Sequence, residues 1–157
     1  MAIFSVDELD AFVAGARREG KIVVFTNGVF DLLHPGHLRY LQASRRHGDL
    51  LVVGVNSDRS VRAIKGESRP VTSQDERAEM LAALSCVDAV AVFDEDTPAE
   101  LIERLGPDVL VKGEDWKDRE NPGREFVESR GGRMAFERFE SGYSATAIIE
   151  KVRTLLH

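Results

Sequence analysis

A short apolar run that breaks into a glycine turn and then into two histidines constrains this chain more than any other feature. The sequence from Phe25 reads Phe-Thr-Asn-Gly-Val-Phe-Asp-Leu-Leu-His-Pro-Gly-His and ends at His37. Residues 21–26 are β-branched and aromatic without polar alternation, which is typical of a strand covered on both faces. A helix is expected to begin at the histidines. The strand therefore brings a turn and a helix start to one edge of a sheet.

The spacing of His34 and His37 indicates an anion site. Helix-start N–H groups and the helix dipole favour anions, and side chains three positions apart share one helix face. Both imidazoles and the exposed amides are therefore expected to converge on phosphate. The alternative is that His34 only caps the helix and His37 is an ordinary histidine, but the preceding strand and glycine turn favour the phosphate site. The chain is expected to handle a nucleotide.

Helix and strand signals alternate along the rest of the chain. Helices are predicted from the Ser5 cap, after His37, from the caps at Ser73 and Thr97, and after Ser144; strands are predicted over 21–26, 50–55, 89–93 and 108–111. Such alternation is typical of a parallel sheet whose ligands lie beyond the carboxyl ends of the strands. We expect one domain over residues 1–157, of the α/β class. Its fold should be Rossmann-like, with a mostly parallel five-stranded sheet flanked by helices.

Composition narrows the function classes. The formal net charge of −6 argues against a general nucleic-acid binder, because phosphate backbones are held by excess Lys and Arg. No apolar run approaches the roughly 20 residues that span a bilayer, and the amino terminus is acidic and helix-like. We therefore expect a cytoplasmic protein without membrane contact. Cys86 is the only cysteine, which excludes an internal disulfide, and its apolar setting predicts a buried, inert thiol.

Several motifs together resemble the HxGH class of nucleotidyltransferases, whose signature is a strand, a glycine-containing turn and His-x-Gly-His. The resemblance runs along nearly the whole chain, through Gly54–Asp58, Arg69–Val71, Glu76–Arg77, Cys86–Val90, Asp108–Gly113 and Gly142–Thr146. Within that class the chain is most similar to the heptose 1-phosphate adenylyltransferases. The glycerol-3-phosphate cytidylyltransferases are the nearest rival family.

Nucleotidyl transfer needs positioning and positive charge more than a covalent nucleophile. His34 and His37 would donate hydrogen bonds to the triphosphate and stabilise charge on the leaving pyrophosphate. The resemblance implies that Lys65, in a polar loop after the second strand, bridges the phosphates of substrate and nucleotide. These three residues are the predicted catalytic residues.

The predicted nucleotide contacts come from four further segments. They are Thr26, Asn27, Gly28, Phe30 and Asp31 in the first turn, Arg77 on a helix, Lys112, Gly113 and Asp115 after a later strand, and Tyr143, Ser144 and Thr146 at the last helix. Gly28 allows close backbone approach, and the Arg77 guanidinium is placed to grip phosphate bidentately. Structural alternatives stay open: a turn for Asp31, a solvated loop for Lys65, a salt bridge for Arg77 and a helix cap for Ser144.

The resemblance implies transfer of AMP from ATP to a heptose 1-phosphate, with ADP-heptose and pyrophosphate as products. Mg²⁺ is expected to arrive with ATP, because it binds phosphates and water with few protein ligands; no protein metal ligands are predicted. A separate sugar kinase and a homodimer are the implied partners. The alternatives are a cytidylyltransferase that uses CTP with glycerol 3-phosphate or another small phosphate, a more distant FAD synthetase-like activity, and a nucleotide-binding module without catalysis.

Overall fold

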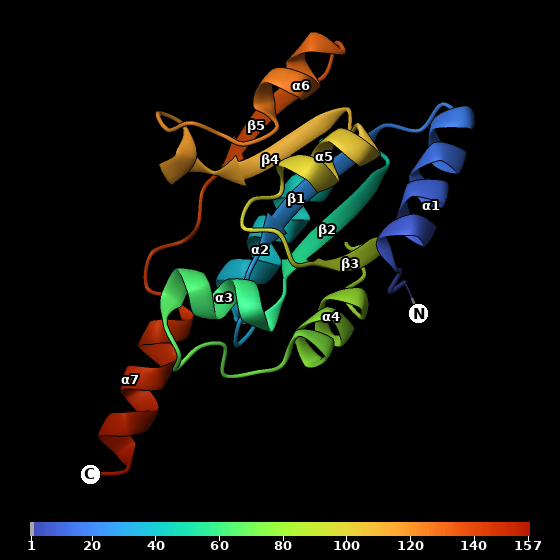
Figure 1. Ribbon diagram of the computed structural model, residues 1–157. Helices are drawn as coiled ribbons and strands as arrows, with labels where there is room; N and C mark the ends of the chain where they lie inside the picture. Colours follow the sequence, from blue (N-terminus) through green and yellow to red (C-terminus); the bar gives the residue numbers. More distant parts are fainter. Residues whose placement is uncertain (1) are drawn as a thin grey trace.

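Five parallel strands lie side by side at the centre of the fold (Figure 1), in a computed structural model that describes residues 2–157. They are β1 (Val23–Gly28), β2 (Leu50–Asn56), β3 (Ala89–Phe93), β4 (Val109–Gly113) and β5 (Arg133–Glu137), in the order β3-β2-β1-β4-β5. The predicted Rossmann-like parallel sheet is confirmed. The chain order reverses between β1 and β4, and open α/β sheets bind ligands at such a reversal, beyond the carboxyl ends of the strands.

Helices surround this sheet, and most of them cover one of its two faces. They are α1 (Val6–Arg18), α2 (Pro35–Arg45), α3 (Asp58–Lys65), α4 (Gln74–Ala82), α5 (Ala99–Leu105), α6 (Arg124–Ser129) and α7 (Ala145–Leu155). One apolar core joins the sheet to α1, α5 and α6 around Leu9 and Phe25. A second core joins the opposite face to α2 and α4 around Leu41 and Val53. Burying each such side chain contributes about 1.5–3 kcal/mol, so the sheet is a rigid base for whatever its edge carries.

The predicted helix starts at Ser5 and Ser73 are confirmed. Each serine accepts the N–H of the third helical residue, and the glutamate at that position accepts the serine N–H in return. The start near Thr97 is one residue later than predicted, because Pro98 is the cap residue of α5 rather than its first helical residue. Capping chemistry therefore located these starts to within a residue.

The predicted loop around Lys65 is wrong, because Lys65 is the last residue of α3. The side chain of Ser57 caps this helix by accepting the N–H of Ser60, and Gly66 ends it with a φ of 97°. A serine cap followed nine residues later by a glycine is a recognisable helix signal. The helix gives Lys65 a fixed base beside the carboxyl end of β2.

β5 and α6, like α3, are elements that the sequence analysis did not place. β5 is a sheet edge with mostly half-buried residues, and its sequence Arg-Met-Ala-Phe-Glu contains no β-branched residue. Such a strand gives a weak sequence signal.

Cys86 was expected to be buried, but it is only half-buried at the second core. This partial burial raises the pKa of its thiol.

α7 extends away from the sheet towards the carboxyl terminus (Figure 1) and buries none of its residues. Apolar side chains of α7 are largely exposed: Val152 is 49% exposed and Leu155 is 76% exposed. Within residues 2–157, no helix combines the length and the apolar character that crossing a bilayer requires.

Candidate active site

A cleft of about 1030 Å³ lies where the chain order of the sheet reverses, beside the ends of β1 and β4. All but two of the predicted site residues line it: Asn27, Gly28, Phe30, Asp31, His34, His37, Lys65, Lys112, Gly113, Asp115, Tyr143, Ser144 and Thr146. Residues far apart in the sequence thus meet in one cavity, as the position of the reversal predicts.

The two histidines form one unit at the start of α2. Their rings are stacked with centroids 3.8 Å apart, and both rings line the cleft. Nδ1 of His34 accepts the backbone N–H of His37 at 3.3 Å, which makes His34 the cap of α2. A neutral imidazole that accepts through Nδ1 carries its proton on Nε2. His34 therefore caps the helix and keeps a donor for the cleft. The predicted cap is confirmed, and contact of His34 with phosphate stays a prediction.

The helix start supplies fewer backbone donors than the sequence analysis expects. Pro35 has no N–H, and the N–H of His37 is bonded to His34. Of the first three helical amides, only that of Gly36 is outside these two constraints. Side-chain donors must therefore provide most of the contacts to an anion here.

Both imidazoles are neutral near physiological pH. Burial lowers the pKa of His37 to about 4, and the neighbouring His34 adds to this effect. Burial also lowers the pKa of His34. Each ring consequently donates one N–H. Nδ1 of His37 is buried and has no hydrogen-bond partner within residues 2–157, which leaves Nε2 as the atom of this ring that can meet a ligand.

Of the two residues between the histidines, Gly36 must be small. A Cβ on Gly36 would lie 2.9 Å from two atoms of the His34 ring and 2.9 Å from Cβ of Tyr143. The Tyr143 ring itself stacks beside His34, with centroids 6.2 Å apart. Gly36 thus lets the segment before α7 approach the histidines closely, which is a physical reason for a glycine in this motif.

Lys112 and Asn27 meet across the sheet reversal. Nζ of Lys112 donates to Oδ1 of Asn27, so the ends of β4 and β1 are tied together at the cleft floor. Lys112 is only 8% exposed, and burial lowers the pKa of its ammonium to about 8. This lysine retains most of its positive charge at neutral pH and has an anion-accessible cleft on one side.

A second wall of the cleft, formed by the end of α3 and the segment after it, carries two cationic side chains. Lys65 ends α3, and Arg69 follows in the segment that connects α3 to α4. The Arg69 guanidinium reaches Oγ1 of Thr146 at 3.5 Å, on the first turn of α7. Ser144 caps α7 by accepting the N–H of Ala147, so its predicted cap role is confirmed while the residue also lines the cleft.

Two predicted contacts are wrong, and a third is qualified. Thr26 is fully buried, and its hydroxyl bonds to Tyr40 and to the carbonyl of Val111 inside the fold. Arg77 is 2% exposed and is occupied by protein acceptors, so it does not face the cleft. Asp31 lines the cleft, but its carboxylate accepts bonds from the segment before α4.

Other cleft residues are absent from the predicted set. Asn56, Asp96 and Thr97 line the cleft, and each lies at or just beyond the end of β2 or β3. Their position after predicted strands was the signal that could have found them. Arg69 and Trp116 also line the cleft. Trp116 follows the predicted contacts Lys112, Gly113 and Asp115 closely in the sequence, whereas only the fold shows that the segment with Arg69 faces the cleft.

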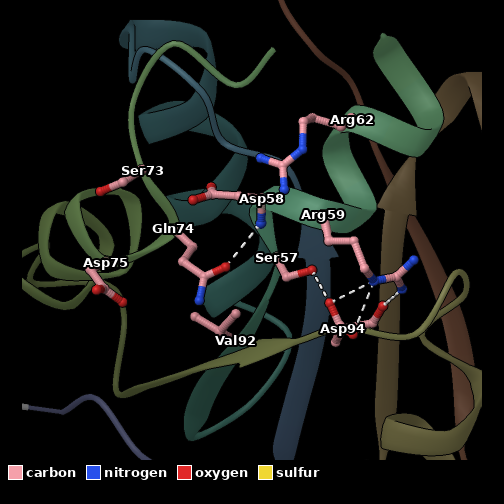
Figure 2. A pocket seen from close by; sticks show the side chains of 9 residues that line it. All are labelled: Ser57, Asp58, Arg59, Arg62, Ser73, Gln74, Asp75, Val92 and Asp94. Carbon is pink, nitrogen blue, oxygen red and sulfur yellow. Dashed lines mark hydrogen bonds and ion pairs between the residues drawn. The ribbon is translucent and has the colours of Figure 1, made fainter. Parts of the chain in front are cut away.

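A second, smaller hollow of about 510 Å³ lies at the starts of α3 and α4. Figure 2 shows its lining, in which Arg59 points to Asp94 and Gln74 points to the backbone of Asp58. Its charged lining is Asp58, Asp75, Asp94, Arg59 and Arg62. The carboxylates outnumber the guanidinium groups here, which disfavours a polyphosphate. The larger cleft holds the paired histidines at the reversal of the sheet, so it is the candidate active site.

Residues 25–151 match the Cytidylyltransferase-like family. The chain belongs to this family. It is 57% identical over 152 residues to the Bifunctional protein HldE of Geotalea uraniireducens, covering 97% of this chain and 31% of that protein. It is 60% identical over 136 residues to the Bifunctional protein HldE of Syntrophotalea carbinolica, covering 87% and 28%. The chain thus spans about a third of the length of these curated relatives.

Solved structures share the fold. The lipopolysaccharide core biosynthesis protein from Thermoplasma volcanium GSS1 superposes with a TM-score of 0.64 at 30% identity, over 80% of this chain and 100% of that chain. A protein with unknown function from Archaeoglobus fulgidus superposes with a TM-score of 0.58 at 19% identity, over 78% and 94%, which concerns the fold alone. The predicted family and sheet architecture are both confirmed.

Proposed function

We propose that this protein transfers AMP from ATP to a sugar 1-phosphate, a heptose 1-phosphate, and releases pyrophosphate. The observation that carries the proposal is the stacked pair of neutral imidazoles, His34 and His37, in a cleft with cationic side chains on two walls. The sugar class rests on the similarity to proteins named HldE and to a protein named for lipopolysaccharide core biosynthesis. The product would be ADP-heptose.

In the proposed reaction, a phosphate oxygen of the sugar phosphate attacks the α-phosphorus of ATP in line. A new oxygen–phosphorus bond forms, and the bond from the α-phosphorus to the bridging oxygen of pyrophosphate breaks. His34 and His37 donate from Nε2 to the phosphate oxygens as negative charge moves to the leaving pyrophosphate. Lys65 and Arg69, which line the same cleft, reduce the repulsion between the two phosphate groups.

The proposal includes Mg²⁺, which would neutralise charge on the triphosphate when bound. Within residues 2–157, no group of three or more His, Cys, Asp and Glu side chains is arranged to hold a metal ion. Phosphate oxygens and water would therefore supply most ligands, as is usual for this ion. The chain's own residues carry the steps described above.

The proposal extends to location and partners. The use of ATP and a phosphorylated sugar is consistent with the cytoplasm. The sugar 1-phosphate must be supplied by a sugar kinase activity, on a separate protein or on another part of a longer chain. A homodimer, implied by the family resemblance, is part of the proposal, and sedimentation velocity tests it by the mass of the particle.

Pyrophosphate release tests the proposed reaction. The protein is incubated with Mg²⁺, with ATP or CTP, and with heptose 1-phosphate or glycerol 3-phosphate as acceptor. The proposal expects release with ATP and heptose 1-phosphate. Turnover with CTP alone would replace it by the cytidylyltransferase alternative. Nucleotide binding without pyrophosphate release in any combination would favour a non-catalytic binding module.

A further inference from the structure

Arg77 joins four segments beneath the cleft. Its guanidinium donates to the carbonyls of Thr72, Val29 and Asn56 at 3.1, 2.7 and 2.9 Å, and to the carboxylate of Asp58 at 2.8 Å. The side chain is 1% exposed. A planar guanidinium with several fixed donors can bridge such diverging acceptors, which a single ammonium cannot.

Asp31 makes a second link between the same segments. Its carboxylate accepts the backbone N–H groups of Val71 and Thr72 at 2.8 and 3.0 Å, and the hydroxyl of Thr72 at 2.9 Å. Burial alone would raise the pKa of Asp31, but these donors and the nearby Arg77 outweigh it and lower the pKa. The carboxylate is thus a fixed acceptor that is already used by the protein.

The turn between these links has an unusual backbone. Phe30 has a φ of 52° and Leu32 has a φ of 49°, and both residues carry a side chain that disfavours the left-handed region. Such conformations are strained and persist only where the surroundings impose them. Here Arg77 holds the carbonyl of Val29 on one side, and the Asp31 side chain anchors the middle of the turn.

We propose that Arg77 and Asp31 are positioning residues that hold the two walls of the cleft at a fixed separation. The turn leads directly into His34 and His37, whereas Thr72 follows the segment that carries Lys65 and Arg69. Both links meet at Thr72, so the histidine wall and the cationic wall are coupled through one junction. This inference rests on the proposed function, because it concerns the geometry in which the phosphates react.

Steady-state kinetics of Arg77→Lys tests the inference. The variant keeps the positive charge but loses the planar guanidinium with its several donors. We therefore expect kcat with ATP and heptose 1-phosphate to fall about 10²-fold, as for reacting groups misplaced by about 1 Å. The affinity for ATP should change less than about threefold, because the contacts to the nucleotide are intact. Trp116, the only tryptophan, lines the cleft, and its fluorescence measures that affinity independently of turnover.

Arg17→Lys is the matched control. Arg17 also donates its guanidinium to two backbone carbonyls, those of Leu105 and Gly106, but at the end of α5 away from the cleft. Its loss should lower the free energy of unfolding and leave kcat unchanged. If Arg17→Lys loses as much turnover as Arg77→Lys at equal stability loss, the effect is general destabilisation and the inference is wrong.

A milder variant covers the case in which Arg77→Lys does not fold. Thr72→Val removes only the hydroxyl that Asp31 accepts, and we expect kcat to fall about tenfold in a folded protein. Wild-type kcat in a folded Arg77→Lys, or in Thr72→Val when it is the only folded variant, would overturn the inference while the proposed function stands. A wild-type protein without pyrophosphate release would refute the proposed function and, with it, this inference.

Discussion

His34 takes both of the roles that its position in the sequence offers. It caps α2 through Nδ1 and lines the cleft beside His37. The spacing of the two histidines predicted that their rings share a face. It could not predict the division of roles between ring nitrogens, because that depends on the extended backbone of His34, with φ −140° and ψ 170°. The sequence did not reveal that Arg77 is buried, since its acceptors include residues far from it in the chain, at Val29 and Asn56.

Replacing His37 by alanine tests its catalytic role. The ring lies in the cleft and is only part of a small cluster, so we expect His37→Ala to fold. Turnover should fall about 10²-fold or more, the loss typical of a transition-state donor. Pyrophosphate release measures it. His47→Ala is the control, because His47 pairs with Glu137 outside the cleft and its loss should leave turnover unchanged. Wild-type turnover in His37→Ala would remove this residue from the catalytic set.

The buried histidine also makes stability depend on pH. His37 binds its proton near pH 6.5 in the unfolded chain and only near pH 4 in the folded protein, because burial disfavours the charged ring. Between these values the unfolded chain binds more protons, so the free energy of unfolding should fall as the pH decreases through this window. Urea denaturation across the window, with His37→Gln as comparison, measures the effect. The variant should lose less stability, and an identical loss in both proteins would contradict the assignment.

Among the elements, helix caps could be predicted from the sequence, whereas the edge strand β5 could not. The boxes at Ser5 and Ser73 fixed two helix starts because side chain and backbone satisfy each other within one turn. The sequence analysis missed α3, the helix that carries Lys65, although Ser57 caps its start and Gly66 ends it. The residues between these caps are mostly polar and exposed, so they show no clear apolar face. Local hydrogen bonding leaves a clear trace in the sequence, whereas packing of a short surface helix does not.

Gly36→Ala tests how closely α2 and the segment before α7 must pack. Alanine is the better helix former by about 1 kcal/mol, so the helix itself should not suffer. The new Cβ would meet the His34 ring and Tyr143, each at 2.9 Å, and must displace one of them. We expect turnover to fall about tenfold or more, measured as pyrophosphate release.

Gly15→Ala is the matched control for this substitution. Gly15 lies inside α1, and a Cβ there meets only the Arg18 guanidinium, at an ordinary 3.7 Å. This variant should gain about 0.5–1 kcal/mol of stability and keep its turnover. Equal turnover in both glycine variants would show that the close approach at Gly36 has no functional consequence.

For the whole molecule, the alternation of elements was enough to predict the parallel sheet and the edge that binds ligand. Right-handed crossovers leave few topologies for such a sequence, and polar residues after β1 and β4 marked the reversal. The direction of the segment around Arg69 could not be predicted, because it depends on contacts between distant parts of the chain, such as that with Thr146. The same holds for α7, whose amphipathic pattern predicted a packed helix but whose apolar side is exposed.

The proposed reaction requires that a triphosphate bind at the stacked histidines His34 and His37. The most direct test is a crystal structure of the protein with Mg²⁺ and a non-hydrolysable ATP analogue. We expect triphosphate oxygens within hydrogen-bond distance of Nε2 of both His34 and His37, between these rings and the wall that carries Lys65. A triphosphate bound away from both rings, for example in the smaller hollow at the starts of α3 and α4 (Figure 2), would contradict the proposed function.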